Sequence, residues 1–253
     1  MGKIAFITGA TAGIGEATAH KLASQGWNLI LTGRRKDRLE SLAGVLKQTH
    51  GIDTFILQFD IRNAAACNSA WGNLPETWQI VDLLVNNAGL AAGRGPVQEG
   101  NPDDWEQMID TNLKGLLYIT RLVSPGMVAR KHGHIINIGS VAGREAYPGG
   151  NVYCATKFAV EGLSRCMRID LAPHQVRVTT ISPGMVETEF SLVRFKGDAD
   201  KAKEVYQGIE PLVAQDIAEA ISWAVHQPER VCINDIYLTC TAQPNANISF
   251  RKG

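Results

Sequence analysis

The sequence predicts an α/β protein built on a doubly wound parallel sheet of about seven strands, with helices on both faces. Short β-rich runs alternate with helix-length amphipathic stretches from the first residue to about residue 240. The short runs are almost continuously apolar, which is typical of parallel strands buried on both faces. Right-handed crossovers then place helices on both sides of the sheet. Because no Pro/Ser-rich linker or low-complexity stretch interrupts this alternation, we expect a single domain over residues 1–253.

Each element is predicted by its own local pattern. The run from Lys3 to Thr8 predicts a buried strand, and the stretch 13–25 predicts a helix that Gly26 ends. The same criteria predict strands at residues 28–32, 54–60, 81–86, 134–138, 176–182 and near 235–240. Helices are predicted at about 36–48, 103–131, 151–171 and near 215–226. In such sheets ligands bind beyond the carboxyl ends of the strands, so the loops after the strands should carry the chemistry.

The composition favours a small-molecule partner. The 253 residues include 25 Lys+Arg and 25 Asp+Glu, so the formal net charge is zero, and 45% are hydrophobic, which excludes a disordered chain. A balanced charge produces no broad field for a nucleic-acid backbone or an anionic bilayer. No apolar run approaches the roughly 18 to 20 residues that a bilayer requires, and the apolar run 4–7 is too short for a signal peptide. We therefore expect a cytoplasmic protein that binds neither nucleic acid nor membrane.

Cysteine and histidine spacing predicts no metal site. The five cysteines form an odd set without a C-x-x-C pair, which indicates reduced thiols rather than a disulfide framework or a zinc site. His132 and His134 flank Gly133, but nothing nearby supplies a third ligand. We therefore interpret this pair as part of a polar loop.

A glycine-rich loop follows the first predicted strand and leads directly into the first predicted helix. Gly9, Gly13 and Gly15 allow a tight turn and a close approach of a ligand to the backbone. The helix N-terminus offers free N–H groups and a partial positive charge to a pyrophosphate. We therefore expect a dinucleotide along this loop, with Thr11 and Ile14 among its contacts. The loop lacks the Gly-Lys of a P-loop, which argues against an ATPase, and a glycine-rich turn without a ligand is the alternative.

The end of the second predicted strand indicates which dinucleotide binds. An NAD site usually has an acid there, about 20 residues after the glycines, to bind the ribose 2′-hydroxyl. This strand is followed by Gly33, Arg34 and Arg35, and no carboxylate occurs before Asp37. Two guanidinium groups can hold a 2′-phosphate in fork geometry, so NADP(H) is favoured over NAD(H). The alternative, a solvated helix start, is disfavoured because two cations at a helix N-terminus oppose the helix dipole.

A serine, a tyrosine and a lysine form the constellation that points to catalysis. Tyr153 and Lys157 lie four residues apart in a predicted helix and so share a face, and Ser140 follows the fifth predicted strand. A neighbouring ammonium lowers the pKa of a tyrosine. Moving that pKa from about 10 to roughly 7 takes about 4 kcal/mol, which Lys157 and the charged nicotinamide of an oxidised cofactor could supply together. We expect Ser140 to hold the substrate oxygen while Tyr153 exchanges a proton and the cofactor exchanges hydride with carbon.

Together these residues resemble the motif set of the short-chain dehydrogenase/reductase family, in its order and spacing over essentially the whole chain. The motifs are the loop 8–15, residues 86–89, Asn112, Ser140, Tyr153, Lys157 and the pair 183–184. The resemblance implies a Rossmann-type fold and an NAD(P)-dependent oxidoreductase acting on CH–OH groups without metal. It implies a catalytic tetrad of Asn112, Ser140, Tyr153 and Lys157, in which Asn112 supports a proton relay and Lys157 also binds the nicotinamide ribose. It also implies cofactor contacts from Asp60, Ile61, Asn87, Ala88, Gly89, Pro183, Gly184, Val186 and Thr188.

Several stretches are similar to a narrower group of that family, the NADP-dependent 3-hydroxy acid dehydrogenases, which also act on serine or allo-threonine, and to related reductases of malonic semialdehyde and sulfoacetaldehyde. These stretches are residues 86–91, 108–112, 133–140, 149–153 and 193–198. The group shares a short substrate that ends in an anion. In this sequence Arg144 and Arg194 offer cations to such an anion, and Tyr147 offers a hydroxyl. Carboxylate and sulfonate are both candidate anions.

Two segments near the C-terminus are expected to complete the site. Residues 188–211 carry mixed helix and turn signals and form a candidate lid, beside which Glu187 and Glu189 are expected to be solvated.

The tail, residues 245–253, alternates polar and apolar residues, which predicts an extended strand with one buried face. A monomer seldom exposes residues such as Ile248 and Phe250, so we expect the tail to dock near the active site of another subunit, with Phe250 at the substrate. The family resemblance implies a homotetramer. A disordered end is the alternative.

Two rival functions are compatible with parts of the pattern. A 3-oxoacyl reductase of the same family would take a substrate on a long thioester arm, but the short polar region around Arg144 and Arg194 favours compact charged substrates. A non-catalytic NADP sensor would have no need of Ser140, Tyr153 and Lys157 together. The sequence therefore predicts an NADPH-dependent, reversible reduction of a small anionic aldehyde or ketone to its hydroxy form.

Overall fold

The computed structural model describes residues 2–252, and within that range seven parallel strands form one sheet. The strand order is β3-β2-β1-β4-β5-β6-β9, so the chain builds outward from β1 in one direction and then from β4 in the other. This reversal defines a doubly wound sheet, and it confirms the predicted fold class. The strands are β1 (Ile4–Ile7), β2 (Asn28–Gly33), β3 (Thr54–Gln58), β4 (Leu83–Asn86), β5 (Gly133–Ile138), β6 (Val176–Pro183) and β9 (Asp235–Leu238).

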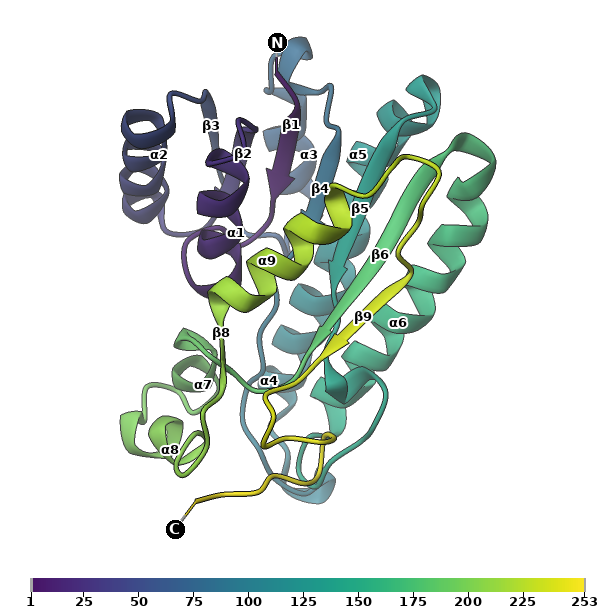
Figure 1. Ribbon diagram of the computed structural model, residues 1–253. Coiled ribbons are helices and arrows are strands. Elements are labelled where there is room, and N and C mark those ends of the chain that lie inside the picture. The colour runs from purple at the N-terminus through teal and green to yellow at the C-terminus, as the bar shows by residue number, and fades with distance from the viewer. Residues whose placement is uncertain (1, 253) are drawn as a thin grey trace.

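Helices cover both faces of the sheet (Figure 1). Successive residues of a strand point to opposite faces, and β1 shows this directly, since Ile7 packs in one apolar cluster and Phe6 in the other. The cluster with Ile7 includes buried residues of α1 (Gly13–Ala23), α2 (Lys36–His50) and α9 (Ala214–Val225). The cluster with Phe6 includes buried residues of α3 (Ala64–Gly72), α5 (Leu116–Arg130) and α6 (Asn151–Leu171).

The predicted helices differ from the observed ones at two places. The first is α3, which the sequence pattern missed because its Ala-rich start carries no apolar stripe; the N-cap Asn63, whose Oδ1 accepts a hydrogen bond from Ala66 N at 3.0 Å, was the available signal. The second is the stretch 103–131, which is not one helix. It contains α4 (Pro102–Ile109), a π-helical turn (Asp110–Gly115) and α5. Single 3₁₀ turns occur at Glu76–Trp78, Val97–Glu99, Val141–Gly143 and Ala172–His174.

The lid segment forms two short helices, α7 (Glu189–Arg194) and α8 (Ala199–Glu204). A small parallel pair, β7 (Val186–Glu187) and β8 (Leu212–Val213), closes the base of this segment. In the part of the chain that the structure describes, no helix combines the length and apolarity needed to cross a bilayer.

The tail does not form the predicted strand. Asn245 Oδ1 accepts hydrogen bonds from the N–H groups of Asn247 and Ile248, and this local turn replaces an extended conformation. The end of the tail runs back to the lid, where the Arg251 guanidinium donates hydrogen bonds to backbone carbonyls at the end of α8. In the single chain, the side chains expected to be buried against another subunit are exposed, Ile248 by 48% and Phe250 by 70%.

Candidate active site

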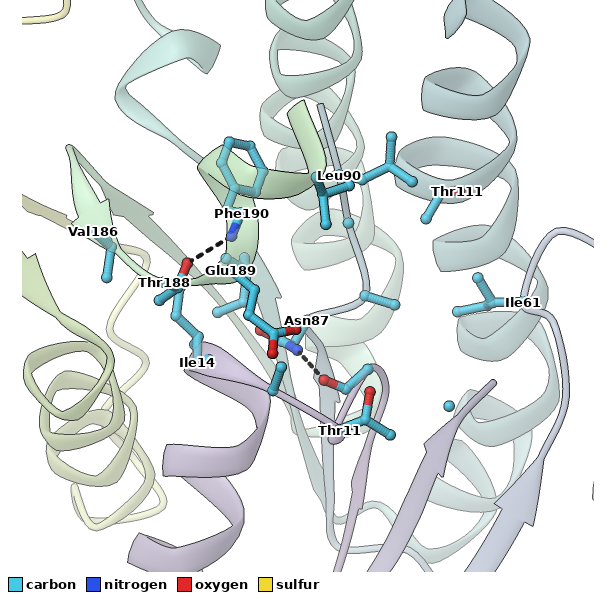
Figure 2. A pocket seen from close by; sticks show the side chains of 18 of the residues that line it. Thr11, Ile14, Ile61, Asn87, Leu90, Thr111, Val186, Thr188, Glu189 and Phe190 are labelled. Carbon is cyan, nitrogen blue, oxygen red and sulfur yellow. Dashed lines mark hydrogen bonds between the residues drawn. The ribbon is translucent and has the colours of Figure 1, made fainter. Parts of the chain in front are cut away.

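A cleft of about 350 Å³ opens where the strands of the sheet end (Figure 2). Its walls come from the loops after β1, β2, β3, β4, β5 and β6 and from the start of α7. Most residues predicted to bind a cofactor line it, namely Gly9, Thr11, Gly13, Ile14, Arg34, Arg35, Asp60, Ile61, Asn87, Ala88, Gly89, Tyr153, Lys157, Pro183, Gly184, Val186 and Thr188. Sequence reasoning missed the lining residues Ala12, Thr32, Gly33, Phe59, Leu90, Thr111, Ile138, Gly139, Glu189, Phe190 and Val193.

The glycine-rich loop has the shape that a dinucleotide requires. Gly9 adopts a φ of 68° and Gly13 a φ of 56°, in the left-handed region. Gly15 lies behind the cleft wall, and a Cβ there would approach Gly9 O to 2.2 Å, so the loop closes only on glycine. No side chain in the described structure caps the N-terminus of α1 at Ala12. The free N–H groups of this turn therefore face the cleft as a site that fits a pyrophosphate.

Thr8 joins two loops of the cleft, a role that the sequence did not reveal. Its Oγ1 accepts hydrogen bonds from the backbone N–H groups of Asn87 and Ala88, both at 2.9 Å. The Asn87 side chain donates in return to the carbonyl oxygens of Thr8 and Gly9. The loops after β1 and β4 are thus held as one unit beneath the cleft.

The predicted catalytic trio is assembled by β5 and α6. The turn after β5 presents Ser140, whose Oγ accepts a hydrogen bond from Ala142 N at 3.1 Å and also hydrogen-bonds the Tyr153 side chain. The side chain of Lys157 is buried, and its Nζ donates to Ile138 O at 2.8 Å. That ammonium lies 5.9 Å from the Tyr153 ring centroid. All three side chains line the same cleft.

Burial governs the acidity of Tyr153 in the chain itself. Burial raises the pKa of Tyr153 to about 12, and the nearby Arg194 guanidinium opposes this shift. Burial also lowers the pKa of Lys157 to about 8, against the attraction of Glu161. The Lys157 ammonium donates its hydrogen bond to Ile138, and the lowering of the tyrosine pKa expected from Lys157 together with an oxidised nicotinamide stays a prediction. At neutral pH the phenol of the chain itself is protonated.

Asn112 lies in the π-helical turn and supports the cleft from outside. Its Oδ1 accepts a hydrogen bond from Leu90 N, and its Nδ2 donates to Leu90 O, both at 2.8 Å. The same Nδ2 donates to Thr156 Oγ1 at 3.1 Å. The side chain is buried and does not line the cleft, so its contacts position the Leu90 loop. Its role in a proton relay stays a prediction.

Arginines at the start of α2 hold the lid in a way that the sequence did not indicate. Glu189 is exposed to solvent, as predicted, but it also forms ion pairs with Arg35 and Arg38, at 2.9 and 2.7 Å, which were not predicted. Both guanidinium groups also donate to Thr11. These two cations hold the pKa of Glu189 below its usual range. Arg34, by contrast, lines the cleft and forms no ion pair with another of the described residues.

Arg194 lies beside Tyr153, although it is not among the residues that line the cleft. Its guanidinium carbon lies 5.0 Å from the ring centroid of Tyr153 and 5.1 Å from that of Phe190. One terminal nitrogen donates to Tyr147 Oη at 2.8 Å. Its Nε is buried and has no hydrogen-bond partner among the described residues. Tyr147 and Tyr153 also line a smaller neighbouring cavity of about 200 Å³.

Two residues predicted to contact substrate lie elsewhere. Arg144 lines neither cavity, because Asp235, at 3.2 Å, and the buried Glu161, at 3.8 Å, attract its guanidinium to the far side of α6. That guanidinium also stacks on Tyr237. Phe250 likewise lines neither cavity of its own chain. A contact of Phe250 with another subunit stays a prediction.

The histidine pair does not form a polar loop. His134 is buried in β5, where its Nε2 lies 2.7 Å from Thr179 Oγ1 and burial lowers its pKa to about 3. His132 is exposed near Asp82 and Glu229. Across residues 2–252, no group of three or more His, Cys, Asp or Glu side chains is placed to hold a metal ion.

Comparison with known proteins gives consistent matches over nearly the whole chain. The model of the short chain dehydrogenase family matches residues 3–198. The NADP-dependent 3-hydroxy acid dehydrogenase YdfG of Escherichia coli K12 is 48% identical over 250 residues, covering 98% of this chain and 99% of that protein. The serine 3-dehydrogenase of Agrobacterium fabrum is 45% identical over 234 residues, covering 92% of each.

A solved structure agrees with this result. The closed form of a serine dehydrogenase complexed with NADP⁺ has 48% sequence identity to this chain and a TM-score of 0.92, and the match covers 99% of this chain and all of the other.

Proposed function

The chain belongs to the short-chain dehydrogenase family and is an oxidoreductase, and from this premise we propose that it reduces small aldehydes or ketones bearing an anionic group, reversibly and with NADPH. The observation that carries the substrate class is Arg194, a half-buried cation 5.0 Å from the ring centroid of the proton donor Tyr153. Its unpartnered Nε can donate to an anion. A short substrate held there would place its carbonyl between Ser140 and Tyr153.

NADP(H) is the cofactor that the cleft fits best. The uncapped start of α1 suits a pyrophosphate, and the end of β2 presents arginines where an NAD site has an acid. The names of the compared proteins support the same cofactor, since YdfG is described as NADP-dependent and the serine dehydrogenase structure is a complex with NADP⁺. When bound, NADPH supplies the hydride.

The residues of the chain supply the proton and the orientation. The Ser140 hydroxyl accepts a hydrogen bond from Ala142 N and hydrogen-bonds Tyr153, so it can donate its proton to a substrate oxygen placed between the two side chains. Tyr153, with a pKa of about 12, is protonated at neutral pH and gives its proton to the developing alkoxide. The Lys157 ammonium and the Arg194 guanidinium then stabilise the phenolate that remains. In the reverse direction this phenolate accepts the proton of the alcohol.

The test is a set of NADPH-oxidation assays with four aldehydes. Malonic semialdehyde, succinic semialdehyde and sulfoacetaldehyde carry an anion, and an uncharged aldehyde of equal size does not. Wild type is compared with Arg194→Ala and with Arg230→Ala, an exposed arginine that lines neither cavity. Carboxylate and sulfonate substrates are ranked by kcat/KM.

The expected result is selective. Loss of a charge-assisted hydrogen bond should lower kcat/KM for the anionic substrates by about 10- to 100-fold in Arg194→Ala. The uncharged aldehyde loses only the stabilisation of the Tyr153 phenolate by Arg194, so its kcat/KM should fall less than that of the anionic substrates, and Arg230→Ala should match wild type. If Arg194→Ala affects all four aldehydes equally, the anion-binding role is wrong.

We also propose that the chain forms a homotetramer in which residues 245–253 contact another subunit. Exposed apolar side chains support an assembly, among them Ile169 on α6, which is 75% exposed, and Phe250. Deletion of residues 245–253 should weaken the tetramer or raise KM, as measured by sedimentation and steady-state kinetics. An unchanged tetramer with an unchanged KM would contradict the proposal.

A further inference from the structure

The anion-binding corner of the cofactor cleft already contains a carboxylate. Glu189, the first residue of α7, forms ion pairs with Arg35 and Arg38 across more than 150 residues of sequence. Figure 2 shows its side chain turned into the cleft, toward the loop that carries Thr11. The three charged side chains are each 41 to 44% exposed, so solvent and ligands reach them.

A 2′-phosphate would need the same donors. A phosphate monoester carries a charge of about −1.5 to −2 and binds guanidinium groups through the fork that a carboxylate also uses. Arg35 and Arg38 already divide their remaining donors between Glu189 and Thr11. Adding the phosphate beside Glu189 would place two anions on one pair of cations, and that pair cannot neutralise both.

We infer that Glu189 is a specificity-determining residue for the cofactor, because its carboxylate occupies the position at which Arg35 and Arg38 would bind a 2′-phosphate. The inference rests on the proposed use of NADP(H). The phosphate displaces the carboxylate and takes both arginines, so Glu189 reduces the affinity for phosphorylated cofactors. A cofactor with a free 2′-hydroxyl leaves the ion pairs intact.

The same displacement reaches the substrate side of the cleft. Glu189 and Arg194 are the two ends of α7, and Phe190 packs edge-on against Tyr153 with ring centroids 5.7 Å apart. When Glu189 is released from Arg35 and Arg38, the first turn of α7 is free to move, and this helix carries Phe190 and Arg194. The two ion pairs therefore hold α7 against the start of α2 until a 2′-phosphate binds.

The test measures binding by calorimetry, with 2′,5′-ADP and 5′-AMP as probes that differ only in the 2′-phosphate. The variants are Glu189→Gln and, as a matched control, Glu187→Gln, which makes the same change at an exposed residue outside the cleft. Glu189→Gln should bind 2′,5′-ADP about three- to tenfold more tightly than wild type, since two exposed ion pairs no longer compete. Its affinity for 5′-AMP should change less than about twofold, and Glu187→Gln should match wild type with both probes.

The outcomes separate the inference from its premise. If wild type binds 2′,5′-ADP more tightly than 5′-AMP but Glu189→Gln does not bind it more tightly still, Glu189 has no role in specificity and only the inference fails. An equal gain in affinity for both probes would overturn the inference in the same way. If wild type binds 2′,5′-ADP no more tightly than 5′-AMP, the proposed cofactor is wrong and both the proposal and the inference fail.

Discussion

The two sides of the cleft are held by different kinds of contact. The fixed side comprises the glycine-rich loop and the trio on β5 and α6, and its bonds are short and buried, such as Lys157 Nζ to Ile138 O at 2.8 Å. The lid side comprises α7 and α8, and several of its contacts with the rest of the molecule are ion pairs near the surface. Glu189 pairs with Arg35, and Lys196 pairs with Asp104 at 2.9 Å.

This difference predicts how each side responds to change. Buried hydrogen bonds are strong in a low dielectric and costly to leave unpaired, whereas exposed ion pairs contribute about 0 to 1 kcal/mol and weaken with salt. The fixed side should therefore keep its geometry through each catalytic cycle. The lid can open at small cost, as substrate entry and product release require.

The largest effect is expected for the proton donor on the fixed side. Tyr153→Phe removes the phenolic proton and should lower kcat by about 10²- to 10⁴-fold while leaving the binding of NADPH unchanged. Steady-state kinetics and fluorescence titration measure the two quantities. Tyr118→Phe, the same change on α5 away from the cleft, is the control and should retain full activity. Intact turnover in Tyr153→Phe would remove the proposed chemistry altogether.

A smaller but substantial effect is expected for the packing of the glycine-rich loop. In Gly15→Ala the new Cβ would meet Gly9 O at 2.2 Å, and this backbone clash should lower the free energy of unfolding by about 1 to 3 kcal/mol. Gly44→Ala in α2 is the matched control, because nothing lies within 4 Å of its Cβ. It should be neutral or stabilising by about 0.5 to 1 kcal/mol. If denaturant titration gave equal stabilities for the two variants, the close approach of Gly15 to Gly9 in the glycine-rich loop would be contradicted.

The buried ammonium of Lys157 should appear in the pH dependence of stability. Its folded pKa is about 8, below the 10.5 that is usual for a solvated lysine, so between pH 8 and 10.5 the unfolded chain binds more protons than the folded chain. Stability of wild type should therefore rise with pH in that window, by up to about 1.4 kcal/mol per pH unit. Subtracting the stability curve of Lys157→Met, measured over the same pH range, removes the contribution of all other titrating groups. A difference that is flat or falls with pH would mean that the ammonium is not buried as described.

The smallest effect is expected where the lid meets α4. Asp104→Asn breaks the ion pair with Lys196 and should cost less than about 1 kcal/mol, which corresponds to a rise in KM of at most about fivefold. Trypsin should cleave more rapidly at the lid lysines. Asp103→Asn, an exposed neighbour on α4, should behave as wild type. If Asp104→Asn lowered kcat strongly, the contacts of the lid would be as important for catalysis as those of the fixed side, and the comparison would be wrong.

Sequence patterns predicted the features that depend on nearby residues, namely the helix that carries Tyr153 and Lys157 and the residues at the strand ends that line the cleft. The helix at 151–171 was predicted with the bounds of α6, and Ser140, Tyr153 and Lys157 line one cleft because strand ends and a four-residue helical spacing place them there. The lining glycines and the residues after β4 and β6 follow from the same rule, since parallel strands end at one edge.

The remaining features depend on contacts between distant segments. Arg144 looked like a substrate cation until the fold brought Asp235 beside it from 91 positions away. The ion pairs of Glu189 were not predicted, because nothing in its own neighbourhood of the sequence revealed Arg35 and Arg38. The rise in the pKa of Tyr153 was missed for a related reason, because the extent of burial comes from packing and not from the spacing of Lys157.

The half-exposed corner formed by Arg35, Arg38 and Glu189 has an evolutionary consequence. It lies on α2 and α7, whereas the proton-transfer trio lies on β5 and α6, so a mutation at the corner changes none of the residues that transfer the proton. Surface changes at such positions usually alter stability by less than about 0.5 kcal/mol. Descendants of this enzyme can therefore exchange one coenzyme for another by drift at the rim, while the reaction itself is inherited without interruption.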